Sequence, residues 1–285
     1  MKKFSVLLAL TLVLSCNYNL AQASCHRHGS SCSSCVYVVR SDNFQEERTF
    51  PKTDKYSLFV DTTINYYSNG SKRTYYNYTI FKQDGSVLAS NCSDVQHVLV
   101  DNKDYFLIKK GSYYKILDSK ALEVANRKYT RAQEVMPNRI LVRVNKRYGI
   151  IDIKENVIVP IKYKEFTEVG NNLFITKLNG YYGMIDSSNK VYLKDEYDRI
   201  KPLYDTYLIK KAGKYGIVDI KGNIILDANC DKIKKMGEYI IVEKDNLYGV
   251  YDSLGNKISD IEYKKVKLER NQLKIKKDGQ WQELL

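Results

Sequence analysis

One short segment gathers most of the residue types that bind metals or carry out redox chemistry. Residues 25–35 contain two of the chain's three histidines and several cysteines, namely Cys25, His26, His28, Cys32 and Cys35. Thiolate and imidazole groups are ligands for zinc and copper, so a metal site is one interpretation. A redox-active C-x-x-C dithiol is another. Since no second ligand pair or thioredoxin-like pattern follows, we favour a serine-rich linker, free or closed by disulfides, as an oxidising compartment permits.

The residues before this cluster have the pattern of an export signal. Two lysines precede an apolar run over residues 4–14, and residues 21–23 form an A-x-A cleavage site. The run is too short to span a bilayer. We therefore interpret residues 1–23 as a bacterial signal peptide, with Cys16 as an alternative lipidation site that would anchor the protein. Both interpretations predict an exported protein that is periplasmic, secreted or lipid-anchored in the envelope.

The remaining candidates for catalysis form no recognisable constellation. His97 lies in an alternating apolar run, where a surface or core position is more common than a catalytic base. No nucleophile elbow, phosphate-binding loop or zinc-protease motif stands in a suitable context. An enzyme acting on an envelope polymer would need a site before residue 105, where four acids show no telling spacing: Asp42, Glu46, Glu47 and Asp54. The sequence therefore favours a protein that is not an enzyme.

The elements that would position any site come from an internal repeat. Tyr-Gly pairs recur at spacings of 34, 33 and 33 residues, and single aromatic residues extend the series at both ends; these anchors are Tyr114, Tyr148-Gly149, Tyr182-Gly183, Tyr215-Gly216, Tyr248-Gly249 and Trp281, with a weaker match at Tyr78. An aspartate follows four residues after each anchor, at Asp118, Asp152, Asp186, Asp219 and Asp252. A third column stands fifteen residues after it, at Tyr129, Tyr163, Tyr197, Cys230 and Tyr263.

Each unit has the pattern of β-structure. The segment Leu173–Asp186 consists of an apolar run, an Asn-Gly turn and a second run, which indicates a β-hairpin. A further turn and a third run complete the unit. We expect the aspartates to be turn residues and the anchor tyrosines to lie in the core between neighbouring units. The glycine beside each anchor would let another backbone approach.

The predicted fold is all-β, an elongated stack of three-stranded antiparallel units of about 33 residues, with a closed propeller-like arrangement as the alternative. Residues 105–285 hold the repeats, residues 36–104 an irregular cap with a degenerate first repeat, and residues 24–35 the Cys/His/Ser-rich segment. Cys92 and Cys230 fall in or near the third column, so we expect two separate buried thiols without a disulfide.

The repeat resembles the WG-repeat family, whose unit is similar to K-W-G-x-I-D-x-x-G-x-x-V-I-P-x-x-Y-D. Residues 148–166 (YGIIDIKENVIVPIKYKEF) and 215–233 (YGIVDIKGNIILDANCDKI) match it closely. The family's tryptophan is tyrosine here except at Trp281, which Gln282 follows in place of glycine. The resemblance implies a repeat architecture and a binding role, and says little about chemistry.

The net charge of +13 indicates affinity for anionic partners. Paired lysines recur by unit and would form a stripe along a stack, although such lysines also serve to keep strand edges from aggregating. We expect a non-enzymatic binding scaffold whose partner is a protein or an anionic envelope polymer. Nucleic acid is an improbable partner for an exported chain, and a membrane contact would come only through the lipid anchor. The alternative is a metal-binding or thiol-redox protein acting through the cluster at residues 25–35.

Overall fold

A computed structural model of the protein describes residues 38–124 and 127–284, and every regular element in these ranges is a β-strand. The predicted all-β class is confirmed. The signal peptide, Cys16 and the cluster Cys25, His26, His28, Cys32 and Cys35 lie outside the described residues. The chain divides into two compact units between Lys128 and Tyr129, whereas the sequence placed a boundary between residues 104 and 105. Within the described ranges there is no helix of the length and apolar character that crossing a membrane requires.

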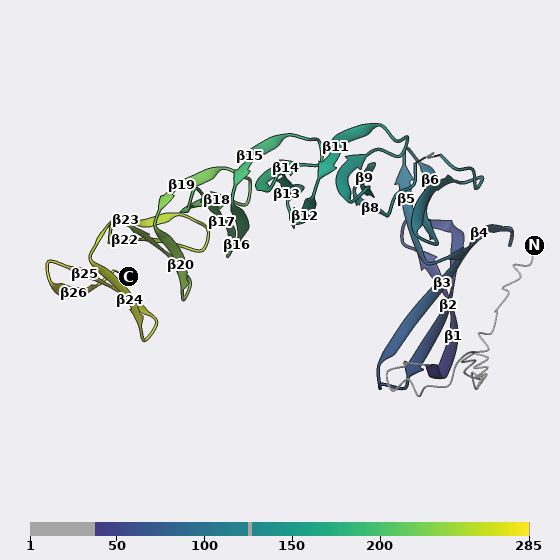
Figure 1. Cartoon of the computed structure of the whole chain (residues 1–285), viewed down its shortest axis with the longest axis horizontal. Coiled ribbons are helices and arrows are strands. Elements are labelled where there is room, and N and C mark those ends of the chain that lie inside the picture. Colours follow the sequence, from purple (N-terminus) through teal and green to yellow (C-terminus); the bar gives the residue numbers. More distant parts are fainter. Residues whose placement is uncertain (1–37, 125–126, 285) are drawn as a thin grey trace, which may run out of the picture. The chain divides into compact units, whose positions relative to one another are not determined.

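The second unit consists of a row of small antiparallel sheets, each formed by strands in their chain order (Figure 1). Its sheets are β8 (Arg131–Met136), β9 (Arg139–Val144), β10 (Arg147–Ile151), β11 (Val157–Tyr163); β12 (Glu165–Gly170), β13 (Leu173–Leu178), β14 (Tyr181–Asp186), β15 (Val191–Tyr197); β16 (Arg199–Leu203), β17 (Thr206–Lys211), β18 (Lys214–Asp219), β19 (Ile224–Cys230); β20 (Lys232–Met236), β21 (Tyr239–Lys244), β22 (Leu247–Tyr251), β23 (Lys257–Tyr263); and β24 (Lys265–Glu269), β25 (Gln272–Lys277), β26 (Gln280–Glu283).

The complete repeat has four strands, so the prediction of three-stranded units is wrong. The additional strand comes first in each sheet. In β16 it follows β15 after the single residue Asp198, and its sequence RIKPL buries only Ile200 and Leu203. A five-residue edge strand that carries Arg199, Lys201 and Pro202 has little of the β-branched alternation that identifies strands from sequence. The sequence pattern therefore does not predict this strand.

The repeated glycine beside the anchor tyrosine lies under a bulge of the fourth strand. Tyr148 pairs with Tyr163 and Ile150 with Val159, so the one residue between them on β10, Gly149, opposes the three residues 160–162 of β11. The surplus backbone crosses Gly149, where a Cβ atom would lie 2.6 Å from the carbonyl oxygen of Val159. The other repeats share this arrangement: the nearest backbone oxygen would lie 2.9 Å away at Gly183 and 2.4 Å away at Gly216, with a looser approach of 3.2 Å at Gly249. Glycine is therefore required because no side chain fits between these two strands.

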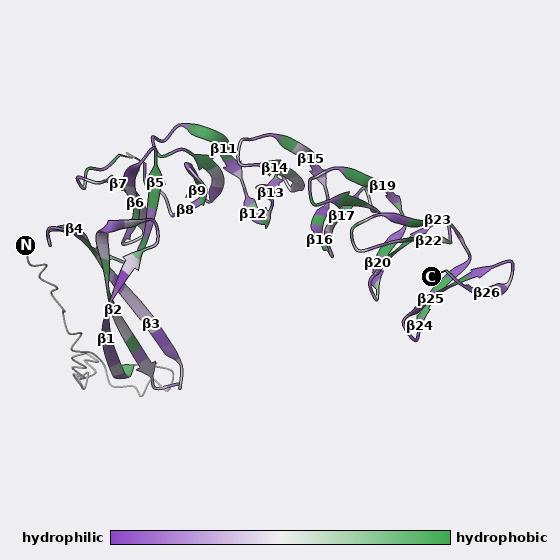
Figure 2. Cartoon of the chain, turned by 180° about the vertical axis from the view of Figure 1, so that it is seen from behind, coloured by the Kyte–Doolittle hydropathy of each residue, from purple (hydrophilic) through white to green (hydrophobic). Residues whose placement is uncertain are grey.

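The core of the second unit lies between consecutive sheets. Tyr163 packs on Phe166 with ring centroids 5.8 Å apart, and Phe166 packs on Phe174 at 5.0 Å, which joins β11 to the sheet that follows. Equivalent clusters join each later pair of sheets. Each repeat thus buries its apolar side chains against its neighbours, as stacked repeats do. In Figure 2 the green hydrophobic stretches recur on β11, β15 and β19, in step with the period.

The aromatic residues of this core belong to the third column rather than to the anchors. Tyr163, Tyr197 and Tyr263 are buried, whereas the anchor tyrosines are half-buried and Trp281 is 41% exposed. The anchors thus meet the predicted core position only in part: Tyr148, Tyr182, Tyr215 and Tyr248 pack against the clusters between sheets but stay half-buried. They stand on the third strand, one strand inward from the edge strand that carries the third column, and lysine and arginine side chains partly cover them.

The repeated aspartates close the turn after the third strand, as their spacing predicts. Asp219 Oδ1 accepts hydrogen bonds from the backbone N–H groups of Lys221 and Asn223, at 2.8 Å each, and Oδ2 accepts one from Asn223 Nδ2 at 2.9 Å. Asp152 and Asp252 make the same three bonds. Burial acts to raise the pKa of Asp219, but these hydrogen bonds outweigh it and lower the pKa below its ordinary value. A charged carboxylate is thus built into the turn.

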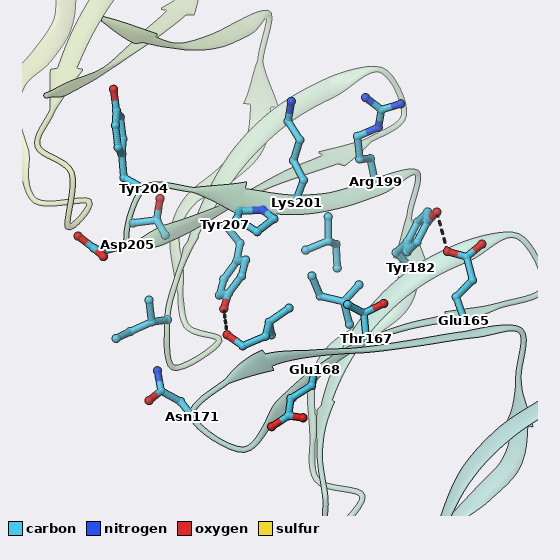
Figure 3. Close-up of a pocket in the computed structure, with 16 residues that line it drawn as sticks. Glu165, Thr167, Glu168, Asn171, Tyr182, Arg199, Lys201, Tyr204, Asp205 and Tyr207 are labelled. Carbon is cyan, nitrogen blue, oxygen red and sulfur yellow. Dashed lines mark hydrogen bonds between the residues drawn. The ribbon is translucent and has the colours of Figure 1, made fainter. Parts of the chain in front are cut away.

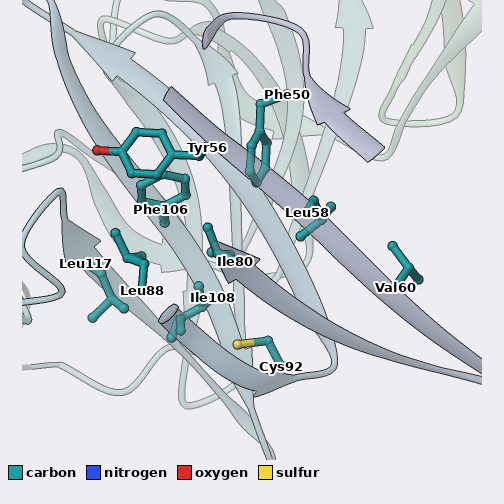
Figure 4. Close-up of a cluster of buried hydrophobic side chains, with 11 residues drawn as sticks. Phe50, Tyr56, Leu58, Val60, Ile80, Leu88, Cys92, Phe106, Ile108 and Leu117 are labelled. Carbon is teal, nitrogen blue, oxygen red and sulfur yellow. The ribbon is translucent and has the colours of Figure 1, made fainter. Parts of the chain in front are cut away.

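The first unit holds two sheets, formed by β1 (Val38–Phe50), β2 (Thr53–Tyr67), β3 (Lys72–Lys82), β4 (Val87–Cys92) and by β5 (Asp94–Val100), β6 (Lys103–Lys110), β7 (Tyr113–Asp118). Its first sheet keeps the bulge of the repeats, since Tyr78 pairs with Cys92 and Ile80 with Ala89. Figure 4 shows the apolar cluster that this sheet shares with the next, including Cys92 and Phe106. Cys92 and Cys230 are both buried and free, so the predicted absence of a disulfide between them is confirmed.

Candidate binding surface and cleft between repeats

The anchor residues lie in a cross-strand row that recurs in the six sheets that follow β1–β4. The row, called the anchor row below, contains one residue from each of the first three strands, placed opposite one another by the sheet register. The anchor rows are Asp94–Lys109–Tyr114, Arg131–Arg143–Tyr148, Glu165–Lys177–Tyr182, Arg199–Lys210–Tyr215, Lys232–Glu243–Tyr248 and Lys265–Lys276–Trp281. In each row the first residue is exposed and the second is half-buried. The row crosses the first three strands near their ends and faces solvent.

The row of Glu165, Lys177 and Tyr182 is fully hydrogen-bonded. Lys177 Nζ donates to Glu165 Oε1 at 3.2 Å and to the Tyr182 hydroxyl at 3.0 Å, and that hydroxyl donates to Glu165 Oε2 at 3.2 Å. The ammonium also lies 4.4 Å from the centre of the Tyr182 ring. Hydrogen bonds to Tyr182 first and to Glu165 second raise the pKa of Lys177. One carboxylate thus uses both of its oxygens to complete the row.

Two other rows contain an acid. In the first unit, the Tyr114 hydroxyl donates to Asp94 Oδ2 at 2.6 Å, with Lys109 Nζ 5.6 Å from the centre of the Tyr114 ring. In the row of Tyr248 the charges are exchanged, because the acid, Glu243, stands on the second strand and Lys232 on the first. Burial first, and then the neighbouring Glu243, raise the pKa of Tyr248. In each of these rows the acid stands next to a cation and the anchor.

The other three rows contain two cations, an aromatic residue and no acid. Arg143 lies over Tyr148 with its guanidinium carbon 5.3 Å from the ring centre, and Lys210 Nζ lies 5.2 Å from the centre of the Tyr215 ring. Both contacts are cation–π interactions. Beside Trp281 the contact comes from Lys267, whose Nζ lies 4.5 Å from the ring centre. Rows with and without an acid alternate along the chain.

A cleft of about 720 Å³ lies between the sheet β12–β15 and the sheet β16–β19, beside two of these rows (Figure 3). Its floor includes apolar side chains such as Ile175 and Ile200. Glu165 and Glu168 lie on one wall and Arg199 and Lys201 on the other. The cleft is open to solvent, and it is lined by both signs of charge together with three tyrosines.

Hydrogen bonds from tyrosine hydroxyl groups fix the walls and the rim of the cleft. The Tyr207 hydroxyl donates to the backbone carbonyl of Val169 at 3.0 Å, which ties β17 to β12 (Figure 3). Tyr204 stands at the rim in the left-handed region, with φ of 52°, in the turn between β16 and β17. Its hydroxyl donates to the carbonyl of Gly237, and Lys235 Nζ lies 3.9 Å from its ring centre. The rim is therefore fixed by the next repeat as well.

The cleft presents charged and aromatic side chains around apolar ones. Its lining residues include no histidine, cysteine or serine, and Glu165 is occupied by Lys177 and Tyr182. Among the described residues, Lys201 and Glu168 have no hydrogen bond or ion pair through their side chains, so their charges are open to a ligand. Charged groups around an apolar floor with fixed aromatic side chains are typical of recognition sites.

The other residues singled out from sequence have structural positions. His97 is buried, with Nε2 2.9 Å from Asp104 Oδ1 and its ring 5.2 Å from that of Phe106, so of the two expected positions, surface or core, it has the core one. Asp42 pairs with Arg40 and Glu46 with Arg48, in both cases on β1 itself. Within the described ranges no three His, Cys, Asp or Glu side chains gather as metal ligands would.

The first-strand residues of the anchor rows, and the cleft, were not identified from sequence. The sequence does contain a signal for these first-strand residues. Each stands seventeen residues after an anchor: Arg131, Glu165, Arg199, Lys232 and Lys265. Their residue type changes from unit to unit, so the column does not stand out as the Tyr-Gly pairs do. Their common position becomes visible only in the sheet register.

Comparison with known proteins supports the repeat assignment. The family model described as WG containing repeat matches residues 148–182 and 215–248. These segments match WG-containing repeats, so the resemblance predicted from the Tyr-Gly spacing is confirmed for this part of the chain. No curated protein matches the chain in sequence.

Two solved structures show weak likeness. Hsv2 of Kluyveromyces lactis is 12% identical over 75% of this chain and 85% of that chain, with a TM-score of 0.31. AztD of Citrobacter koseri is 10% identical over 79% of this chain and 86% of that chain, with a TM-score of 0.25. Both scores are below 0.5, so we infer nothing about function from them.

Proposed function

We propose that the protein is an exported bacterial scaffold that binds a partner, without chemical change to it, along the edge of its repeats at the cell envelope or outside the cell. The observation that supports this proposal best is the cleft between the sheets β12–β15 and β16–β19. It combines an apolar floor, tyrosines fixed by hydrogen bonds, and the charges of Glu168 and Lys201, which have no partner among the described residues. The export signal supports the location.

The recurrence of the anchor rows supports an extended partner. Each repeat presents the same three strands in the same register, so chemically related groups return at the edge of every sheet. A surface of this kind suits a partner that contacts several repeats in succession, and repeat proteins bind commonly in this way. Several weak contacts then act together, which raises the overall affinity.

Hydrogen–deuterium exchange of the full chain, with and without a solubilised envelope fraction of the source organism, tests this proposal. We expect slower exchange in residues 165–171 and 199–207 and no change in the turn at residues 252–256. The substitution Lys201→Glu should reduce the protection. Lys257→Glu on β23, which does not line the cleft, should leave the protection unchanged. Identical exchange rates with and without the envelope fraction would contradict a binding scaffold. A chemically altered envelope component after incubation would contradict it as well.

A further inference from the structure

The alternation of the anchor rows has an energetic consequence. In the sheets β8–β11, β16–β19 and β24–β26, the residues opposite each other on the first two strands are both cations: Arg131 and Arg143, Arg199 and Lys210, Lys265 and Lys276. Like charges placed opposite each other on neighbouring strands destabilise a sheet. In the rows of Glu165 and Glu243 one of the two positions is an acid. The acid-free rows therefore carry a repulsion that an external anion would relieve.

The row of Glu165 shows which anion fits. Its carboxylate binds the ammonium of Lys177 through one oxygen and the hydroxyl of Tyr182 through the other, at 3.2 Å each. A carboxylate is planar and has two acceptor oxygens, so it can receive these two donors at once. Asp94 makes the same contact with Tyr114 in the first unit. In these rows, called occupied rows, a carboxylate of the chain itself accepts the hydrogen bonds that an external anion would accept in the acid-free rows.

The acid-free rows offer the same donors without an acceptor. Lys210 stands beside Tyr215, and Arg143 beside Tyr148, as Lys177 stands beside Tyr182. Arg143 Nε is buried and has no hydrogen-bond partner in the described part of the chain. A buried N–H group without an acceptor is costly, so this atom is a specific reason to expect a bound anion.

We propose that the acid-free anchor rows are carboxylate-binding sites that receive the Asp and Glu side chains of an acidic polypeptide. This proposal rests on the scaffold function above and names the partner class. In the row of Glu165 the carboxylate reaches the half-buried Lys177 on a flexible side chain that crosses from the exposed first-strand position. An extended acidic polypeptide presents the same group on the same kind of side chain. A uronate carboxylate is attached directly to a sugar ring, and a phosphate is tetrahedral, so each would enter the row with a different geometry from that of Glu165.

The primary test is binding of fluorescently labelled poly-L-glutamate to the full chain, measured by anisotropy at fixed low salt. The variant Lys210→Glu supplies the row of Tyr215 with an internal acid, as Glu243 does for Tyr248. We expect it to weaken binding about threefold to tenfold, the range of one lost charge-assisted contact. The matched control is Lys194→Glu, an exposed lysine on β15 outside the rows, which should weaken binding clearly less.

A reciprocal pair of variants tests the site by gain of binding. Glu165→Gln removes the internal acid and converts an occupied row into a free one, so poly-L-glutamate should bind more tightly. Glu168→Gln makes the same change of charge on the same strand but outside the row, and should have a smaller effect. Equal gains from the two variants would show that overall charge, rather than the row, determines binding.

Competition distinguishes the partner classes. We expect poly-L-glutamate and poly-L-aspartate to displace the probe at lower concentration than polygalacturonate or polyphosphate of equal charge. Absence of binding, preference for either of the latter polymers, or equal losses in Lys210→Glu and Lys194→Glu would overturn this proposal. If poly-L-glutamate fails to bind while the envelope fraction still protects the cleft from exchange, the carboxylate proposal is wrong and the scaffold proposal stands.

Discussion

The sheets β12–β15 and β16–β19 have the same strand order, the same bulge and the same anchor position, yet their exposed edges differ in charge. In the first, Glu165 stands opposite Lys177 and completes a hydrogen-bonded row with Tyr182. In the second, Arg199 stands opposite Lys210 and the row has no acid. A change from acid to cation at the first-strand position therefore replaces a row whose charges are paired within the chain by a row of two cations, while the backbone stays the same. The comparison separates the residues that build a repeat from those that give it a ligand.

The residues that build the repeat should give the largest effects, equally in both sheets. Gly216→Val places a side chain where a Cβ atom would lie 2.4 Å from the carbonyl oxygen of Leu226. We expect a loss of about 3 kcal/mol or more in the free energy of unfolding, because the bulge of β19 must move. Chemical denaturation measures it, with Ile224→Val at an exposed position as the control. Unchanged stability would mean that the close approach has no structural role.

The turn aspartates should give the next largest effect. Asp219→Ala removes an acceptor of three hydrogen bonds and should cost about 1–2 kcal/mol in denaturant unfolding. Asp219→Asn should be milder because its amide oxygen can still accept the backbone N–H groups. Since the fold lowers the pKa of Asp219, its contribution is present above the ordinary carboxyl pKa and is lost as the pH falls through the folded value. A stability difference that persists undiminished in acid would contradict this account.

Asp195 distinguishes the two sheets in their interior. It occupies the bulge of β15 over Gly183, where the equivalent residue of β19 over Gly216 is Ala228, and it accepts a hydrogen bond from Thr176 Oγ1 at 3.2 Å. Burial raises the pKa of Asp195, although Thr176 and Lys162 oppose the shift. A raised pKa means that the protonated form is favoured by folding, so stability is highest below the ordinary pKa and falls as the pH rises through the folded value.

The variant Asp195→Asn should therefore raise the thermal midpoint at neutral pH by about 2 °C and lose this advantage in acid. Thermal unfolding at several pH values measures the difference. Asp227→Asn on β19, at an exposed position, serves as the control. An advantage for Asp195→Asn that is independent of pH would show that the charge of Asp195 is not the cause.

The smallest effects should come from the rows themselves in the absence of a ligand, and they should have opposite signs. Lys177→Met leaves Glu165 without its cation and should lower the thermal midpoint slightly. Lys210→Met removes a repulsion with Arg199 and should leave the midpoint unchanged or raise it by about 1 °C. Differential scanning calorimetry at low salt measures both, and high salt should reduce both differences. The same sign for both variants would remove the distinction between occupied and open rows.

The backbone of the repeat could be predicted from sequence because its determinants are fixed in type and spacing. The Tyr-Gly pairs and the aspartates such as Asp219 return at constant intervals, and each has one steric or hydrogen-bonding reason. The first strand was missed because RIKPL in β16 carries few apolar residues. The rows were missed because Glu165, Lys177 and Tyr182 become neighbours only through the register of that strand.

The anchor tyrosines were placed in the core on the assumption that a repeated aromatic residue is buried. The structure gives the fully buried positions to the third column, of which Tyr163 is an example, and leaves the anchors half-buried at the margin of the core, partly covered by lysine or arginine. The cleft depends on details that no period encodes, such as the left-handed conformation of Tyr204 and the bond from Tyr207 to the Val169 carbonyl. Sequence therefore predicts what every repeat shares, and the structure is needed for what differs between repeats.

The most direct test of open and occupied rows is fluorine NMR of the full chain with 3-fluorotyrosine placed site-specifically at Tyr215 or at Tyr182. On addition of poly-L-glutamate, the resonance at Tyr215 should shift and saturate, because a carboxylate enters the row of Arg199 and Lys210. The resonance at Tyr182 should stay in place, since Glu165 already fills that row. Equal shifts at the two positions, or a shift at Tyr182 alone, would contradict the account.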